Sequence, residues 1–246
     1  MDRNTESAVN NGLHSSAVNK IILQAGGIIC LVFILYSFAT MAIVFLAGAA
    51  PDTVEECFSM LNENRITGLL RLDILTVFIM PLYYVLFYSI YIALKKHDNH
   101  LMRLAVLLIL AGLTMFLAAP SVFSYLHLSD KYALAVTEAE KSQLLSAGEA
   151  IKAADIWHGT GPVIGGILLQ TGALIISFLM LGNNIFSRST AVVGIITHGL
   201  DLLHIIISFF LPFAGYILMV TAGTLYLLWF LLIGLGLFRI CRKEFT

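Results

Sequence analysis

Three ionisable residues lie inside one long apolar stretch of the sequence. The stretch runs from Thr190 to Leu211, and it contains His198, Asp201 and His204, each three residues from the next. Carboxylates and imidazoles can carry protons, bind ligands or hydrogen-bond to neighbouring helices. Because a charged group inside a bilayer is costly, such residues normally face other protein or a water-filled cavity. The pattern therefore predicts that other helices cover this one.

Helix geometry places Asp201 near the middle of this predicted span. It lies eleven residues past Thr190, or about 16 Å along a helix, and the hydrocarbon core is about 30 Å thick. In the two neighbouring spans, Gln170 and Thr224 lie about as many residues from the connecting turn as Asp201 does, so they should lie at the same depth. We predict a buried polar layer with these members: Gln170, His198, Asp201, His204 and Thr224. Such a layer is either a structural network that joins three spans or a proton path or ligand site.

The same residues fit a metal or haem site poorly. His198 and His204 are about 9 Å apart along a helix axis, so one helix cannot close both of them on one ion. The cysteines fall in a span, in a loop and at the far terminus, and no pair of them suggests a disulfide or a metal site: Cys30, Cys57 and Cys241. We predict no metal and no cofactor.

A second polar group is expected where predicted spans end on one side of the bundle. Its members are Arg71, Asp73, Glu149 and His158, with His127, Asp155 and Trp157 near them. Charges at span ends are usually solvated or paired, and Trp is common at the membrane interface. A concave polar cluster at the mouth of a bundle is the alternative, and it would be a ligand site. Arg71 is the candidate partner for Asp73 or Glu149.

These residues have to be positioned by a membrane bundle. The chain is 59% hydrophobic and 12% charged, and several apolar runs exceed the roughly 18 residues that indicate a membrane span. We predict an all-α, polytopic bundle with six transmembrane helices and an additional amphipathic extracytoplasmic helix. The six spans are expected at residues 21–49, 69–94, 104–128, 159–181, 190–211 and 213–238.

The polar segments complete the predicted organisation. Residues 1–20 are expected to be a disordered cytoplasmic tail, 21–240 one six-span domain, and 241–246 a basic cytoplasmic end. Segment 129–157 should be extracytoplasmic and amphipathic. Within it, Thr137 and Glu140 have the spacing of a capping box. Pro81 and Pro120 should interrupt the second and third spans.

The distribution of basic residues predicts the orientation. With both termini cytoplasmic, that side holds nine of the fourteen Lys and Arg residues, and the positive-inside rule favours it. They are Arg3, Lys20, Lys95, Lys96, Arg103, Arg188, Arg239, Arg242 and Lys243. We therefore expect a multi-pass protein of the plasma membrane with its N and C termini in the cytoplasm.

Several short motifs in the second half of the chain resemble one membrane-protein family. They are Ser146-Ala147-Gly148-Glu149, Gly159-Thr160-Gly161, Met180-Leu181, Ile185-Phe186, Arg188, Ala191, Gly194 and the stretch from Leu227-Leu228-Trp229 to Arg239. The pattern resembles the domain-of-unknown-function 4386 family of bacterial and archaeal integral membrane proteins. The resemblance implies a multi-span bundle and implies no activity, substrate or catalytic residue.

Three classes of function remain open. The first is an integral membrane protein without a known activity that binds a small ligand or a partner. The second is a membrane-embedded enzyme that uses buried His, Asp or Glu as acid and base. The third is a proton-coupled transporter. The expected partners are the lipid bilayer and a small-molecule or lipid ligand. Nucleic acid is not expected, because no basic cluster is present, and the sequence does not indicate an oligomeric state.

Overall fold

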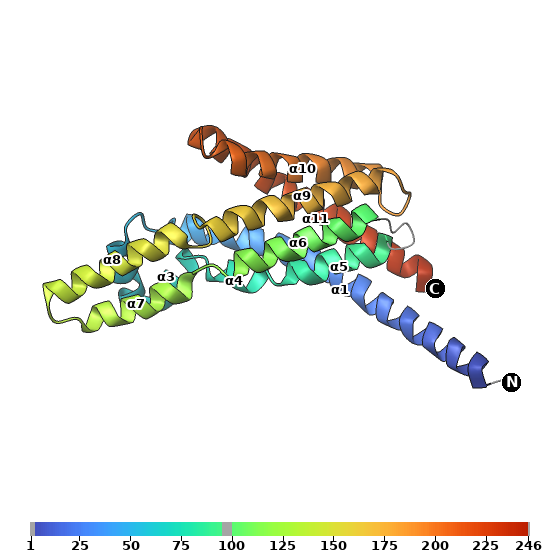
Figure 1. Ribbon diagram of the computed structural model, residues 1–246, viewed down its shortest axis with the longest axis horizontal. Coiled ribbons are helices and arrows are strands. Elements are labelled where there is room, and N and C mark those ends of the chain that lie inside the picture. Colours follow the sequence, from blue (N-terminus) through green and yellow to red (C-terminus); the bar gives the residue numbers. More distant parts are fainter. Residues whose placement is uncertain (1–2, 95–99, 246) are drawn as a thin grey trace. The chain divides into compact units, whose positions relative to one another are not determined.

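The structure, a computed structural model, describes the backbone of residues 3–94 and 100–245 and the side chains of residues 17–94 and 100–243. Every regular element within these ranges is an α-helix (Figure 1). The helices are α1 (Arg3–Ala47), α2 (Val54–Glu63), α3 (Arg65–Arg71), α4 (Ile74–Ile79), α5 (Leu82–Leu94), α6 (His100–Leu117), α7 (Val122–Leu134), α8 (Glu138–Ala154), α9 (Thr160–Leu181), α10 (Arg188–Ile207) and α11 (Pro212–Phe245). Lys95 and Lys96, which contribute to the predicted orientation, lie outside the described residues.

Six helical segments of the described chain are long and apolar enough to cross a membrane. They are Ala17–Ala47, Ile74–Leu94, His100–Leu134, Thr160–Leu181, Arg188–Ile207 and Pro212–Lys243. This confirms the prediction of an all-α polytopic bundle. The chain is an integral membrane protein, because a polar coat that could keep these segments in water is missing from the composition.

The N-terminal segment differs from the sequence expectation. Residues 1–20 were predicted to form a disordered tail, whereas α1 is continuous from Arg3 to Ala47. Extension of an existing helix avoids the cost of nucleation, and no proline interrupts this stretch. The apolar part of α1 can therefore extend a helix into its polar flank.

The second span also begins later than predicted, so Arg71 and Asp73 precede it. Helix α3 ends at Arg71, and Asp73 has φ 62° and ψ 41°, a left-handed conformation that breaks the helix before α4 begins. The predicted break at Pro81 lies between α4 and α5. The first turn of the predicted second span is therefore a separate short helix.

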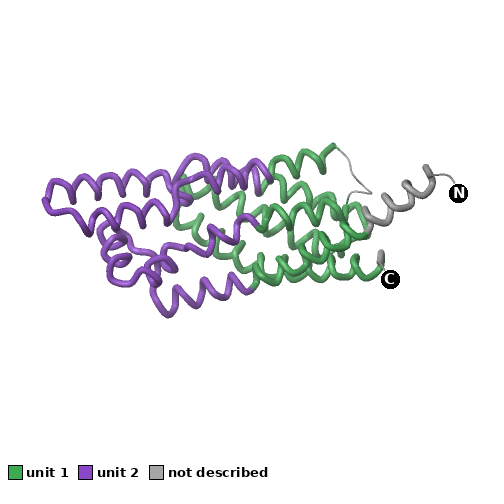
Figure 2. The backbone as a smooth tube through the Cα atoms, turned by 90° about the horizontal axis from the view of Figure 1, so that it is seen from below, with its two compact units in different colours: residues 1–34, 82–109, 170–246 green, residues 35–81, 110–169 purple. Residues whose placement is uncertain are grey.

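The chain forms two compact units, which Figure 2 distinguishes by colour. Unit 1 comprises residues 1–34, 82–109 and 170–246, and unit 2 comprises residues 35–81 and 110–169. Helix α9 contributes to both units, because the division falls between residues 169 and 170. Each unit is described by itself below.

Unit 2 contains the polar segments around a small apolar core. Helices α7 and α8 form an antiparallel hairpin (Figure 1), and both pack on α2. The buried residues of this core are Val54, Cys57, Phe58, Leu61 and Tyr125. Helix α8 begins with the predicted capping box of Thr137 and Glu140, which is confirmed by both of its hydrogen bonds.

Two glycines bring α6 and α9 together within unit 2. A methyl group on Gly165 would lie 2.6 Å from the carbonyl oxygen of Gly112, and one on Gly112 would lie 2.8 Å from the backbone nitrogen of Leu169. No side chain fits between the two backbones at this point. The small-residue spacing at Gly161 and Gly165 thus marks a close helix contact.

Unit 1 is organised around aromatic side chains and the hairpin of α10 and α11. Trp229 is fully buried, and its ring lies near the rings of Phe87, His198 and Phe230. A methyl group on Gly194 of α10 would lie 2.7 Å from Nε1 of Trp229, so α10 approaches α11 closely here. This packing places the middle of α10 against protein, as the ionisable residues in it require.

Candidate functional site

Within unit 1, a hydrogen-bonded layer joins α9, α10 and α11. The amide nitrogen of Gln170 donates to Asp201 Oδ2 at 2.5 Å, and the hydroxyl of Tyr226 donates to the same oxygen at 2.8 Å. Because the amide oxygen of Gln170 can only accept, His198 donates to it from Nδ1, at 2.8 Å. Three of the five predicted members of the polar layer therefore belong to one hydrogen-bonded network, in which Gln170 joins His198 to Asp201.

Thr224 was predicted as the member from α11, and the structure places it elsewhere. Its side chain is exposed, and its hydroxyl donates to the carbonyl of Val220 on its own helix at 3.0 Å. Tyr226 takes the predicted place. Residues two positions apart on a helix point about 200° apart, so only one of the two can face the layer.

His204 is also outside the hydrogen-bonded layer. Its Nδ1 lies 3.1 Å from the carbonyl oxygen of Gly215 and 3.2 Å from the hydroxyl of Ser208. These contacts join the end of α10 to the start of α11. His204 therefore stabilises the turn between the two helices, where the Ser208 hydroxyl also donates to the His204 carbonyl.

Each polar side chain of the layer uses another member as its partner. Among the described residues, no Lys or Arg lies within ion-pair distance of Asp201. Three buried atoms of α10 and α11 lack a hydrogen-bond partner within the described chain: Thr197 Oγ1, His198 Nε2 and Trp229 Nε1. The rings of His198 and Trp229 are perpendicular, with centroids 4.7 Å apart, which is typical of favourable edge-to-face packing.

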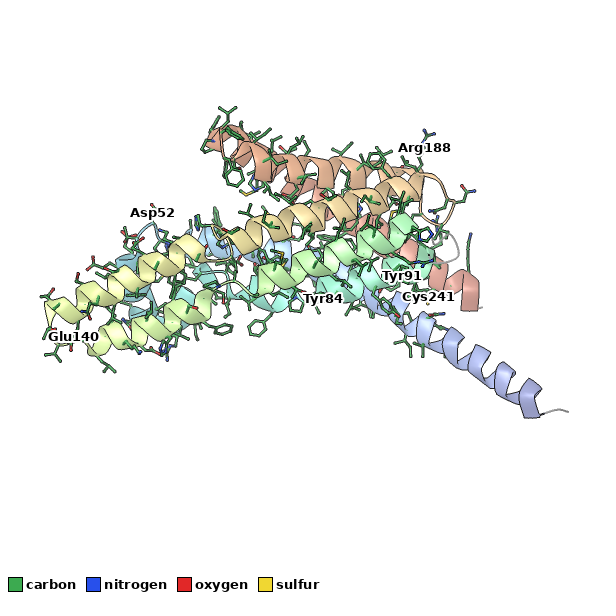
Figure 3. The ribbon with its side chains drawn as sticks, viewed as in Figure 1. Asp52, Tyr84, Tyr91, Glu140, Arg188 and Cys241 are labelled. Atoms are coloured by element: carbon green, nitrogen blue, oxygen red, sulfur yellow. The ribbon has the colours of Figure 1, made fainter. Side chains whose placement is uncertain are left out.

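Unit 2 contains a pocket of about 380 Å³, the size of a small-molecule site. Residues from four parts of the chain line it: the loop before α2 together with α2, the end of α3, the start of α7, and the end of α8 together with the turn to α9. Its polar and aromatic lining residues are Asp52, Cys57, Arg71, Asp73, Ser121, Tyr125, Lys152, Asp155, Trp157 and His158. Asp52, on the loop before α2, is labelled in Figure 3.

Three of the four predicted mouth residues lie on the wall of this pocket. Arg71, Asp73 and His158 line it, whereas Glu149 does not and is exposed on α8. Of the residues expected near them, Asp155 and Trp157 line the pocket, and His127 is exposed outside it.

Arg71 is held by a backbone carbonyl and not by a carboxylate. Its Nε donates to the carbonyl oxygen of Ala49 at 2.9 Å, and Nη2 donates to the same oxygen. The predicted pairing with Asp73 or Glu149 is absent, since within the described ranges no carboxylate lies in ion-pair distance of this guanidinium. The Ala49 carbonyl follows the end of α1, where a cation is favoured by the helix dipole.

Asp155 organises the turn between α8 and α9. Its Oδ1 accepts from the backbone nitrogens of Trp157 and His158 at 2.9 and 3.1 Å, and from His158 Nδ1 at 2.9 Å. Its Oδ2 accepts from the hydroxyl of Tyr125 at 3.2 Å. The buried carboxyl of Asp155 is thus fully used by donors, which fixes the orientation of His158 at the pocket.

Burial shifts the pKa of two further groups on the pocket wall, Cys57 and Asp73. Burial raises the pKa of the Cys57 thiol above its ordinary value, although Lys152 lowers it in part. A thiol with a raised pKa is a weak nucleophile, because the thiolate is the reactive form. Burial also raises the pKa of the Asp73 carboxyl, which the hydroxyl of Thr76 opposes by donating to it at 2.5 Å.

Comparisons with known proteins add no assignment: no family model, no curated protein and no solved structure matches the chain. The resemblance to the domain-of-unknown-function 4386 family therefore stays a prediction. Sequence reasoning missed Tyr226, Lys152 and Cys57 as members of the two sites. The helical spacing of 100° per residue could have distinguished Tyr226 from Thr224, since the two residues lie on opposite sides of α11.

Proposed function

We propose that this integral membrane protein binds a small polar molecule in the pocket of unit 2. The pocket itself is the observation that carries the proposal, because charged and aromatic side chains from four separate segments converge on one space of about 380 Å³. Concave sites with a few convergent polar groups are the usual places for small ligands.

Binding fits the arrangement better than catalysis does. The pair of His158 and Asp155 resembles an oriented general base. However, among the residues that the structure describes, no hydroxyl or thiol forms a hydrogen bond with the His158 side chain. Cys57 is the nucleophile type on the same wall, and its raised pKa opposes that role. The enzyme alternative therefore lacks an activated group.

The proposed location of the pocket is the extracytoplasmic side of the plasma membrane. An even number of crossings puts both termini on one side, and the positive-inside rule favours the cytoplasm for them. The acidic and polar segments of unit 2 then face outward. Accessibility of a cysteine introduced at Ser142 to a membrane-impermeant maleimide in intact cells tests this orientation.

Native mass spectrometry of the full chain released from mild detergent tests the binding proposal. We expect a bound small molecule on the wild-type chain, loss of it in Ser121→Trp, which fills the pocket, and retention of it in Ser142→Trp, an exposed position on α8. Equal retention in both variants, or a wild-type chain that carries nothing, would contradict the proposal.

A further inference from the structure

The two cations on the pocket wall are unusual in how they are held. Lys152 donates from Nζ to the carbonyl oxygen of Asp52, and Arg71 donates to that of Ala49. Both acceptors are backbone groups of the same loop, before α2. In the described chain, neither cation has a carboxylate within ion-pair distance. A backbone carbonyl orients a cation without cancelling its charge, so both keep a full positive charge at the pocket.

The two charges also lie in the same part of the pocket. Lys152 and Arg71 both favour the charged form of the buried Cys57 thiol, and Glu56 and Glu149 oppose it, so charges of both signs influence this thiol. Cys57 is part of the pocket lining and is 4% exposed. The cations therefore approach this thiol from α3 and from α8, which are separate elements of unit 2.

The buried acidic residues of the lining are held by groups other than these two cations. The carboxyl of Asp155 is used by two backbone N–H groups, His158 and Tyr125. Burial raises the pKa of the Asp73 carboxyl, which accepts a hydrogen bond from the hydroxyl of Thr76 and none from Arg71 or Lys152. Asp52 is exposed, so solvent screens its carboxylate. Among the described residues, Arg71 and Lys152 therefore line the pocket without a carboxylate in ion-pair distance of either one.

We propose that the ligand of this pocket carries an anionic oxygen group, a phosphoryl or a carboxylate, which Arg71 and Lys152 bind together. The proposal rests on the proposed binding function and names its ligand class. Arg presents a planar array of donors that matches such groups, and Lys adds a mobile point charge. Within the described residues, the Arg71 guanidinium has no further acceptor besides the Ala49 carbonyl, so its remaining N–H groups can bind the ligand.

Isothermal titration calorimetry of the purified full chain in a maltoside detergent tests this inference. The probes are inorganic phosphate, acetate, phosphatidylglycerol in micelles, and choline as a cation of similar size. We expect Lys152→Gln, which keeps a donor for the Asp52 carbonyl, to raise the Kd for the bound anion about tenfold or more. Lys141→Gln is the matched control, because Lys141 is another lysine of α8 and pairs with Glu138 outside the pocket.

A second variant distinguishes a loss of anion binding from a loss of folding. Arg71→Lys keeps the charge but loses the array of donors, so we expect weaker anion binding with an unchanged melting temperature. Binding of phosphate or acetate with this dependence supports a free anion, and binding of phosphatidylglycerol alone with the same dependence supports a lipid headgroup.

Three results would overturn the inference. Binding of choline alone would exclude an anion and would leave the binding function in place. An affinity for anions that is equal in the wild-type chain and in Lys152→Gln would mean that Lys152 does not bind the anion. A wild-type chain that binds none of the probes would overturn the ligand class, and mass spectrometry of co-purified molecules would then decide the binding function separately.

Discussion

The polar layer of unit 1 and the pocket of unit 2 use charged residues in opposite ways. In the layer, Gln170, Asp201 and Tyr226 use one another as partners, and the bonds join three helices. In the pocket, Arg71 and Lys152 are oriented by backbone carbonyls and keep their charges. A polar group that is satisfied by its neighbours specifies packing. A polar group that is oriented but not neutralised is available to a ligand.

Gln170→Leu should distinguish the layer from the pocket most clearly, because it should affect stability and not anion binding. The substitution removes a donor to Asp201 and the acceptor of His198. Loss of both bonds in a buried site should lower the free energy of unfolding by about 2–4 kcal/mol. Thermal unfolding of the full chain in detergent measures this, and anion binding in the pocket should persist below the new melting temperature.

Gln143→Leu is the control for this change, because Gln143 is exposed on α8. A similar loss of stability in both variants would mean that the layer does not join the helices. Loss of pocket binding in Gln170→Leu at a temperature where the chain is still folded would mean that the two regions are not separate.

Gly148→Val should affect the pocket region and not the layer. A methyl group at Gly148 would meet the side chains of Val54 and Phe58, the latter at 3.1 Å, where α8 packs on α2. Overpacking of this kind costs about 1–3 kcal/mol. Hydrogen exchange of α2 and α8 should rise, while exchange of α10 stays unchanged. Ala147→Val, at an exposed neighbouring position, should change neither.

Substitutions at Asp73 test the left-handed backbone at the pocket wall. A β-branched side chain is disfavoured at φ 62°, so Asp73→Val should lower stability by about 1–2 kcal/mol. Asp73→Asn tolerates this conformation. Because burial raises the pKa of Asp73 in the folded chain, the wild type should lose stability as the pH rises through that raised pKa.

The wild type and Asp73→Asn should therefore differ in how the melting temperature depends on pH. Asp73→Asn should abolish the loss of stability that begins above about pH 4 and should match or exceed the wild type at neutral pH. A wild-type melting temperature that rises over this range because of Asp73 would contradict the assignment.

The smallest effect is expected at the start of α8. The backbone nitrogens of Thr137 and Val136 donate to Glu140, and they hold the pKa of this carboxyl below its ordinary value of 4.5. The capping bonds should therefore be complete above that value and be lost as the pH falls through the lowered pKa. Glu140 is labelled in Figure 3.

Hydrogen exchange at the first turn of α8 measures this local effect. Glu140→Gln should exchange faster than the wild type at about pH 6, and the difference should shrink at about pH 3. Glu138→Gln is the control, because its carboxylate pairs with Lys141 and makes no cap. Neither the layer nor the pocket should respond, which limits the effect to one helix end.

The sequence could predict which segments span the membrane and which polar residues of neighbouring spans lie at the same depth in it. Hydropathy identified six spans, and equal distance from the connecting turn correctly paired Gln170 with Asp201. Depth alone does not define which side of a helix a residue faces. Thr224 was therefore chosen in place of Tyr226, and His204, which is rotated by about 120° from His198, was included wrongly in the layer.

The pocket was predicted less completely, because its walls depend on irregular backbone. The left-handed conformation of Asp73 ends α3 and places Arg71 beside the loop before α2. No local sequence pattern indicates that break. On α8, Lys152 is rotated only about 40° from the buried Gly148, and Glu149 about 100°. The lysine therefore reaches the pocket, and the glutamate does not.

The contact between Gly112 and Gly165 has a mechanical consequence for the pocket. Helices α6 and α9 touch backbone to backbone there, and they lead directly to the turns that carry Ser121 and His158. The nitrogen of Ile156 also donates to the carbonyl of Pro120 at 3.1 Å, which ties those two turns together. Backbone contacts therefore fix this part of the pocket wall, and we expect any adjustment to a ligand to occur in the other lining segments, the loop before α2 and the end of α3.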